Sequence, residues 1–153
     1  MGINTKILGA LILSSLLFYS VVGYVTLLYF DEAQEIAYVQ KAETLARALD
    51  ANIRNRKELD DLNRLFSIIQ KYIWLDPDIL GVDIFLFENS RLICKSSNRR
   101  ERVGVEADSM NWEALREDQI VSRVINTDSF RVLRVYSPIH IARQLAGTYR
   151  IEL

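Results

Sequence analysis

The feature that most constrains this chain is an uncharged stretch near its start, residues 7–30, which reads ILGALILSSLLFYSVVGYVTLLYF. It follows Lys6 and ends before the acids Asp31 and Glu32. A helix needs about 20 apolar residues to cross the hydrocarbon core of a bilayer, and this run is slightly longer. A buried soluble helix of this length would need protein on every side, which the polar sequence after it does not supply. The run therefore predicts a transmembrane helix at 7–30, preceded by a short cytoplasmic tail at 1–6.

A cleaved signal peptide is the alternative interpretation of the same run. The apolar part of a signal peptide is typically about 7 to 15 residues long, and no small-residue cleavage site follows this longer run. Both points favour an uncleaved signal anchor. Lys6 lies before the span and acids follow it, although Lys41 and Arg47 are not far beyond. This charge pattern favours an amino terminus inside the cytoplasm, with the chain from Asp31 onward outside.

Composition limits what the remaining residues can do. About 120 residues follow the span, enough for one small domain with its own core. The chain has 19 Lys plus Arg and 20 Asp plus Glu, so no overall field attracts it to nucleic acid. Cys94 and His140 are the only residues of their types, which excludes an internal disulfide, a zinc finger and a His-rich metal site. With no phosphate-binding loop, dinucleotide fingerprint or nucleophile elbow, we expect no enzyme, no catalytic residues, no metal and no cofactor.

Residues 31–56 predict an amphipathic stalk helix. Its apolar positions recur at steps of three or four, at Ile36, Val39, Ala42, Leu45, Ala46, Leu49 and Ile53. No Pro or Gly interrupts the chain from Thr26 to Asp76, so span and stalk are expected to form one rod. A narrow stripe with alanines in it can pack against a second copy, giving a homodimer through the stalk. The same stripe can instead cover the chain's own sheet, and the sequence leaves both possibilities open.

Residues 57–153 predict an α+β domain. A second helix over 57–74 has one apolar face and ends at Asp76 and Pro77, because Pro77 has no backbone N–H and disfavours helix before it. After it the apolar period changes to that of strands, expected at 81–87, 92–96, 119–126, 130–138 and 145–153. The result is a five-stranded antiparallel sheet with long helices before it and a short helix after the second strand.

Several local expectations follow within this domain. The first strand carries apolar residues on both faces, which is typical of a central strand covered twice. Asp108 or Ser109 is expected to cap the short helix, with Trp112 buried. Turns are expected at 88–91 and 126–129, and a loop through His140 and Arg143. Cys94 is expected to be a small buried hydrophobe, and His140 to have a turn or solvent role rather than to sense pH.

The order of these elements resembles the extracytoplasmic PAS-like sensor modules of the single Cache or PDC type. Such modules occur in bacterial sensor histidine kinases, chemoreceptors and membrane diguanylate cyclases. The resemblance rests on the span followed by a long helix, on GVDIFLFENSRLICKSS with Val103-Gly104 shortly after, and on RVLRVYSPIHIARQLAGTYRIEL. It implies a single-pass protein of the bacterial cytoplasmic membrane whose carboxy-terminal domain senses a ligand. Because receptors of this type continue into a transmitter, we expect either a fragment of a longer receptor or a stand-alone module that works by binding.

The resemblance also directs attention to one strand face. In related sensors small ligands lie between the sheet and its flanking loops and helix, held by basic and aromatic side chains. Arg134 and Tyr136 share a face of their strand, so a carboxylate could meet a guanidinium fork and a hydroxyl together. Arg150 joins them if the last strand pairs in a suitable register, whereas a slip of one residue would replace Arg134 by Arg131.

Two further groups extend this expectation. Trp112 and Tyr149 line the same pocket or pack in the core. Arg99, Arg100 and Arg102 either clamp an anion or headgroup or are simply solvated. Arg134 and Arg150 are also solvated, with only weak surface ion pairs, if their sheet face is exposed.

The sequence therefore predicts a ligand- or partner-sensing module with a small polar or anionic ligand, which passes binding to the membrane through its amino-terminal helix. The alternative is a membrane-anchored scaffold without enzymatic activity.

Overall fold

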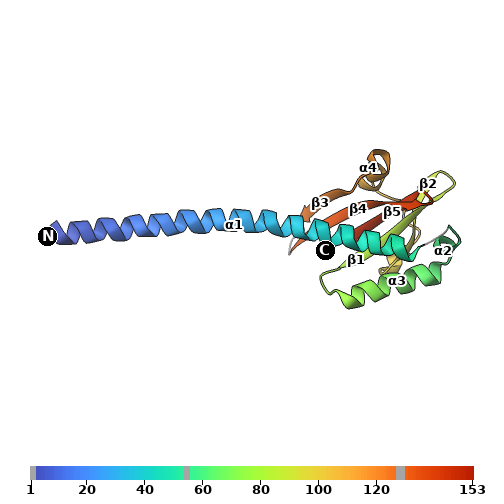
Figure 1. Cartoon of the computed structure of the whole chain (residues 1–153), viewed down its shortest axis with the longest axis horizontal. Coiled ribbons are helices and arrows are strands. Elements are labelled where there is room, and N and C mark those ends of the chain that lie inside the picture. Colours follow the sequence, from blue (N-terminus) through green and yellow to red (C-terminus); the bar gives the residue numbers. More distant parts are fainter. Residues whose placement is uncertain (1–2, 54–55, 127–129) are drawn as a thin grey trace. The chain divides into compact units, whose positions relative to one another are not determined.

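The computed structural model describes residues 3–53, 56–126 and 130–153 of the chain. The chain divides into two units, Met1–Ala37 and Tyr38–Leu153. Helix α1 (Ile3–Asn52) runs through both without a break, as expected from the absence of Pro and Gly after Thr26 (Figure 1). The sequence also predicts a break at 55–57 between the stalk helix and the next helix, and residue 55 lies outside the described residues.

The first unit is the apolar half of α1. The large side chains of residues 7–30 are exposed, and among the described residues α1 is the one helix long and apolar enough to cross a membrane. Three of its hydroxyl groups are satisfied within the helix: Ser14, Ser20 and Thr26 each donate to a backbone carbonyl three or four residues earlier, at 2.8 to 2.9 Å. Such internal bonding suits a helix surrounded by hydrocarbon, where water cannot serve as the partner.

The second unit is built on one antiparallel sheet. In the described part of the chain the order of its strands is β2-β1-β5-β4-β3. The bounds are β1 (Gly81–Glu88), β2 (Arg91–Ser97), β3 (Val121–Asn126), β4 (Arg131–Ile141) and β5 (Gln144–Glu152). This arrangement confirms the predicted fold class, an α+β domain with a five-stranded antiparallel PAS-like sheet.

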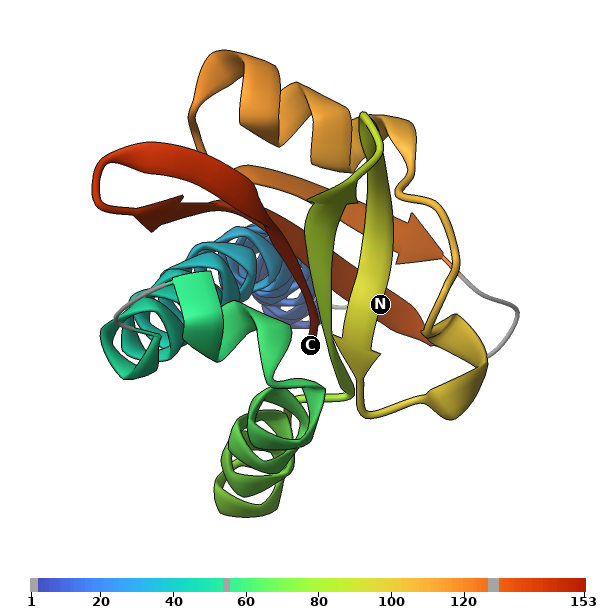
Figure 2. The ribbon, with the colours of Figure 1, turned by 90° about the vertical axis from the view of Figure 1, so that its right-hand side faces the viewer.

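Helices cover both faces of the sheet (Figure 2). The end of α1, α2 (Arg56–Asp60) and α3 (Leu62–Leu75) lie on one face, and α4 (Ser109–Glu117) lies on the other with the 3-10 turn η1 (Arg100–Arg102) between β2 and α4. A small second core of Phe85, Leu92, Cys94 and Leu115 lies under α4. β1 is therefore covered twice and Cys94 is buried, as the sequence predicts.

The main core lies between the long helices and the sheet, and it uses the stripe of the predicted stalk. Five of the seven stripe positions are buried there, namely Ala42, Leu45, Ala46, Leu49 and Ile53. Ile36, by contrast, is 53% exposed. The stripe thus covers the chain's own sheet. Homodimerisation through the stalk stays a prediction, and a dimer contact there would have to use other residues of the helix.

Short polar side chains fix the ends of the helices. Asp61 caps the start of α3 by accepting a hydrogen bond from the Arg64 backbone N–H at 3.1 Å. Asp76 ends that helix in an extended conformation, which the following Pro77 requires. Asp108 caps α4, as expected.

Two tight turns set the length of the hairpins. Asn89 and Ser90 join β1 to β2 with φ of 48° and 66°, and Ala142 and Arg143 join β4 to β5 with φ of 49° and 66°. Two-residue turns of this kind match the twist of the strands they join. They leave no room for the longer loop expected through His140, which is instead a residue of β4, with Nε2 at 2.8 Å from Asp118 Oδ1. The turn expected at 126–129 lies outside the described residues except for Asn126, which is the last residue of β3.

Gly147 allows β5 to lie close to β1. A Cβ atom at this position would lie 1.9 Å from the Phe85 carbonyl oxygen, so no other residue fits without a shift of the backbone. The glycine thus has a packing reason to stand in the middle of a strand.

Candidate functional site

Charged side chains gather on the sheet face that carries α4, here called the α4 face. Because alternate residues of a strand point to opposite sides, β5 directs Thr148, Arg150 and Glu152 to this face. Its intervening residues, Tyr149 and Ile151, belong to the core under the long helices. One strand therefore contributes both to the core and to a polar surface.

The centre of the α4 face is a buried ion pair between Arg150 and Asp83. Their side chains are 4% and 1% exposed, and the Arg150 Nε lies 2.8 Å from Asp83 Oδ2, with Nη2 bonded to the same oxygen. Ser97 donates to the other oxygen of Asp83, and the Phe85 ring lies 5.2 Å beneath the guanidinium carbon. Burial alone would lower the pKa of Arg150, but Asp83 raises it above its ordinary value. The two side chains thus satisfy each other by hydrogen bonds inside the domain.

A second set of bonds joins α4 to the sheet. Tyr136 donates to Asp108 Oδ2 at 3.0 Å, while Asp108 Oδ1 accepts from the backbone N–H groups of Met110 and Asn111 at 3.1 Å. Thr148 donates to Asn111 Oδ1 at 2.6 Å. Burial and the neighbouring Asp108 charge raise the pKa of Tyr136 to about 12, so its hydroxyl stays protonated and acts as a donor. These bonds hold α4 against β4 and β5.

The third feature of the α4 face is a carboxylate, Glu152, that has more than one arginine as its partner. Glu152 is 5% exposed and accepts from two arginines, from Arg134 Nε at 2.7 Å and from Arg99. Burial would raise the pKa of Glu152, but the two guanidinium groups lower it below its ordinary value. Arg134 and Arg99 remain 25% and 31% exposed.

A third arginine adds to this surplus of positive charge. Arg123 of β3 lies directly opposite Arg134 in the strand pairing, and within residues 3–53, 56–126 and 130–153 it makes no hydrogen bond or ion pair. Like charges directly opposite each other on neighbouring strands are destabilising. We call Arg99, Arg123 and Arg134 the arginine cluster. Two of its members share the single carboxylate of Glu152 and the third has no acidic partner in the described part of the chain, so a further anion would be stabilised there.

The sequence placed three of its five candidate residues correctly relative to one another. Arg134 and Tyr136 of β4 lie on the face that carries Arg150, because Tyr136 pairs with Arg150 and Arg134 with Glu152. Trp112 of α4 is 37% exposed rather than buried, and its ring meets the edge of Phe87 at 6.1 Å.

Tyr149 requires a correction, because it lies on the other side of the sheet. Its hydroxyl donates to Asp50 Oδ1 of α1 at 2.8 Å. Burial raises the pKa of both partners. The alternation that brings Arg150 to the α4 face directs its neighbour Tyr149 away from it, so Tyr149 packs in the core.

Sequence reasoning gave no role in the site to four residues of this face: Asp83, Glu152, Asp108 as the partner of Tyr136, and Arg123. A lone acid within the apolar strand GVDIFLF was the available signal for Asp83, since a buried acid needs a partner. Arg99 was assigned to a basic loop, but it pairs with Glu152, whereas Arg100 and Arg102 form the turn η1. In the part of the chain that the structure describes, no cluster of His, Cys, Asp and Glu is arranged to hold a metal ion.

Comparison with known proteins gives likeness in structure only. No protein-family model and no curated protein matches the chain. Among solved structures, the sensor domain of DcuS from E. coli has a TM-score of 0.58 at 16% identity, covering 78% of this chain and 90% of that one. The ligand-binding domain of the amino acid chemoreceptor PctC from Pseudomonas aeruginosa, in complex with GABA, has a TM-score of 0.57 at 13% identity. The fold is that of PAS-like sensor domains.

The extent of these likenesses differs. The match to PctC covers 76% of this chain but 52% of the PctC structure, so the chain spans about half of that domain. A type II free methionine-R-sulfoxide reductase from Thermoplasma acidophilum also matches, with a TM-score of 0.51 at 14% identity, over 60% of this chain and 72% of the enzyme. Because the fold occurs in sensors and in an enzyme, the role of this chain must be argued from its own residues.

Proposed function

We propose that this chain is the extracytoplasmic ligand-sensing module, of the single Cache type, of a receptor anchored in the bacterial cytoplasmic membrane. Its ligand on this proposal is a small anion, with a carboxylate as the recognised group. The observation that carries the proposal is the arginine cluster, in which Arg99 and Arg134 share the carboxylate of Glu152 while Arg123 stands opposite Arg134. The sensor-domain fold supports it.

Arg134 and Arg123 are the residues that meet the ligand. A carboxylate between their guanidinium groups would accept paired hydrogen bonds and remove the repulsion across the two strands. Arg150 has no charge to spare because Asp83 neutralises it, and the Tyr136 hydroxyl is engaged with Asp108. These two residues position α4 beside the ligand instead of binding it.

The apolar part of α1 serves as the membrane anchor in this proposal. Its length, its exposed apolar surface and its internally bonded hydroxyl groups all suit hydrocarbon. A ligand changes the state of such a receptor only by its difference in affinity for two arrangements of the chain. A transmitter such as a histidine kinase would read that change through α1.

Binding to the full chain in lipid nanodiscs tests the proposal. A panel of small carboxylates and amino acids is screened by thermal shift, because a ligand at about 100 times its dissociation constant stabilises by about 2.7 kcal/mol. Arg134→Ala and Arg123→Ala should each weaken the hit, whereas Arg91→Ala, on an exposed arginine of β2, should not. A hit that is insensitive to both cluster variants would reject the arginine cluster as its site.

An anchored interaction protein is the second candidate, and one observation favours it. Trp74 and Leu75 at the end of α3 are 84% and 59% exposed. They are neighbours in the chain and form an exposed apolar pair on the surface. On this alternative a partner protein covers them, and Trp74→Ala would lose the partner without changing the response to carboxylates.

A further inference from the structure

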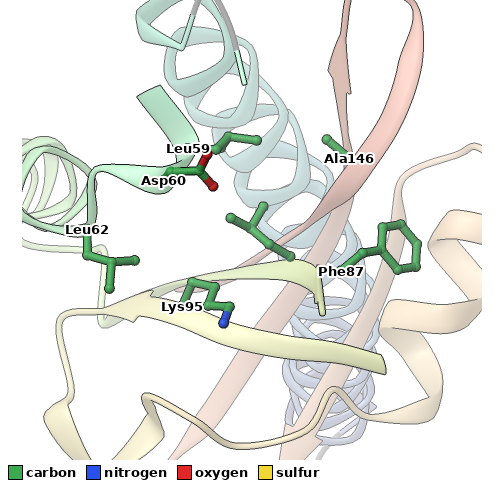
Figure 3. Close-up of a pocket in the computed structure, with 7 residues that line it drawn as sticks. Leu59, Asp60, Leu62, Phe87, Lys95 and Ala146 are labelled. Carbon is green, nitrogen blue, oxygen red and sulfur yellow. The ribbon is translucent and has the colours of Figure 1, made fainter. Parts of the chain in front are cut away.

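The two edges of the sheet differ in how they are protected. β2 lies at one edge, and residues 104–107 cover its middle. The Cys94 N–H donates to the Val105 carbonyl at 2.9 Å, and the Cys94 carbonyl accepts from the Gly104 N–H at 2.8 Å. β2 also carries Lys95, and Figure 3 shows it among the residues that line a pocket next to α2 and α3. Because a lysine on an edge strand discourages the pairing of a further strand, the β2 edge is protected twice.

The other edge strand, β3, has no such cover. It pairs with β4 from Val121 to Asn126, and in the part of the chain that the structure describes its backbone makes no other hydrogen bond. None of its six residues is buried. Since a strand directs the N–H and C=O groups of alternate residues to opposite sides, every second residue of β3 offers both groups at the open edge. This edge can therefore accept one more strand.

The side chains of β3 determine what such a strand must carry. Val121, Arg123 and Ile125 lie on the α4 face, because Arg123 pairs directly with Arg134. Val121 and Ile125 are half-buried, so they favour apolar neighbours on an added strand. Arg123 is exposed and has no acidic partner among the described residues, and the like charge of Arg134 stands opposite it. A carboxylate on the added strand would supply the missing opposite charge.

Charge also decides between the possible partners of this edge. A second copy of β3 would bring another arginine to it, and the strand sequence VSRVIN contains no acid to offset that charge. We infer that the β3 edge binds an extended acidic peptide segment of another protein, which adds a strand to the sheet. A Glu or Asp of this segment lies opposite Arg123, with an apolar residue two positions away on each side.

Recognition of this kind divides affinity and selectivity between two parts of the edge. Backbone hydrogen bonds supply the affinity, and the side chains at alternate positions supply the selectivity. The inference shares Arg123 with the proposed function, so a bound peptide would compete with the small anion for this arginine. It does not require that the small anion binds.

The test uses the full chain in nanodiscs of zwitterionic lipid, with the peptide acetyl-Thr-Val-Thr-Glu-Thr-Val-Thr-amide carrying an uncharged dye. The peptide reads the same in both directions, so parallel and antiparallel addition can each place its Glu opposite Arg123. We expect saturable binding by fluorescence anisotropy and slower hydrogen exchange of the β3 amides. Replacement of the Glu by Gln should weaken binding by about fivefold, because the pair of opposite charges is lost.

N-methylated peptides separate strand addition from simple attraction between charges. One peptide is methylated on the backbone nitrogens of its Val and Glu residues, and the other on those of alternate Thr residues. Because only one of these sets faces β3 in an added strand, one peptide should lose binding and the other should keep it. Equal binding of the two N-methylated peptides would overturn the inference.

An exchange of charge identifies the partner of the peptide's carboxylate. Arg123→Glu should bind the peptide that has Lys in place of Glu and reject the parent peptide, whereas Arg91→Glu, on an exposed arginine of β2, should alter neither affinity. No saturable binding, unprotected β3 amides or an unaltered Arg123→Glu would overturn the inference. A small-carboxylate hit that persists when the peptide fails rejects this inference alone, and peptide binding without any such hit rejects the proposed function alone.

Discussion

Arg150 and Arg134 lie on neighbouring strands and on the same face, yet their surroundings differ. Arg150 is 4% exposed and has Asp83 as a partner that is as deeply buried. Arg134 is 25% exposed and shares Glu152 with Arg99, while Arg123 stands opposite it. A buried pair with matched charges holds a fold together, whereas partly exposed arginines that outnumber their carboxylate are available to a ligand. The balance of charges and the access of water thus separate the two roles.

The largest effect is expected from breaking the matched pair. Asp83→Ala leaves the Arg150 guanidinium buried without a partner, which should lower the free energy of unfolding by about 3 to 5 kcal/mol. Urea unfolding of the variant and of the parent chain measures the difference. The double variant Asp83→Leu with Arg150→Met should recover most of the loss, because it removes both charges. A loss below about 1 kcal/mol in Asp83→Ala would remove the contrast between the two arginines.

A smaller effect with a defined pH dependence is expected from Glu152→Gln. Loss of the charged acceptor should reduce stability at neutral pH by about 1.5 to 3 kcal/mol. Because the pKa of Glu152 is lowered in the folded protein, its contribution is present above the pKa of the unfolded chain. It is lost as the pH falls through the folded value.

Unfolding followed from neutral to acid pH should therefore show a shallower acid limb in Glu152→Gln than in the parent chain. The same variant should bind the anionic ligand more tightly, because it frees two arginines of the cluster. Weaker ligand binding would show that Glu152 itself contributes to recognition.

Removal of the Tyr136 hydroxyl should have a smaller effect again. Tyr136→Phe loses the hydrogen bond to Asp108, which is expected to cost about 1 kcal/mol. Thermal unfolding gives the stability, and hydrogen exchange of the α4 amides should rise because the helix loses one of its attachments. Unaltered exchange in α4 would mean that Thr148 and Asn111 suffice to hold it.

The smallest effect on stability is expected at Arg123. This arginine is exposed and unpaired within the described residues, so Arg123→Ala should change the free energy of unfolding by no more than about 0.5 kcal/mol. Its ligand affinity should nevertheless fall. A variant that unfolds easily and binds normally would reverse the roles assigned to the two kinds of arginine.

Local patterns were sufficient for much of this fold. The alternation of β4 placed Arg134 and Tyr136 on one side, and the capping role of Asp108 followed from its position before a helical segment. Pro77 correctly marked the change from helix to strand. Each of these features depends on residues close together in the chain.

The partners of the charged residues could not be obtained in this way. Asp83 and Arg150 are 67 residues apart, and Arg99 and Glu152 are 53 apart. Their meeting depends on the register between β1 and β5, which tertiary packing sets. Arg123 was overlooked for the same reason, because only the pairing of β3 with β4 brings it opposite Arg134.

The alternation of β5 also has a mechanical meaning. Tyr149 holds Asp50 of α1 on one side of the sheet, and Arg150, the next residue, holds Asp83 on the other. A planar peptide unit fixes the separation of their Cα atoms at about 3.8 Å, whatever the backbone angles on either side of it. A displacement of this strand along its axis would therefore carry both side chains together, and with them their partners on the two faces of the sheet.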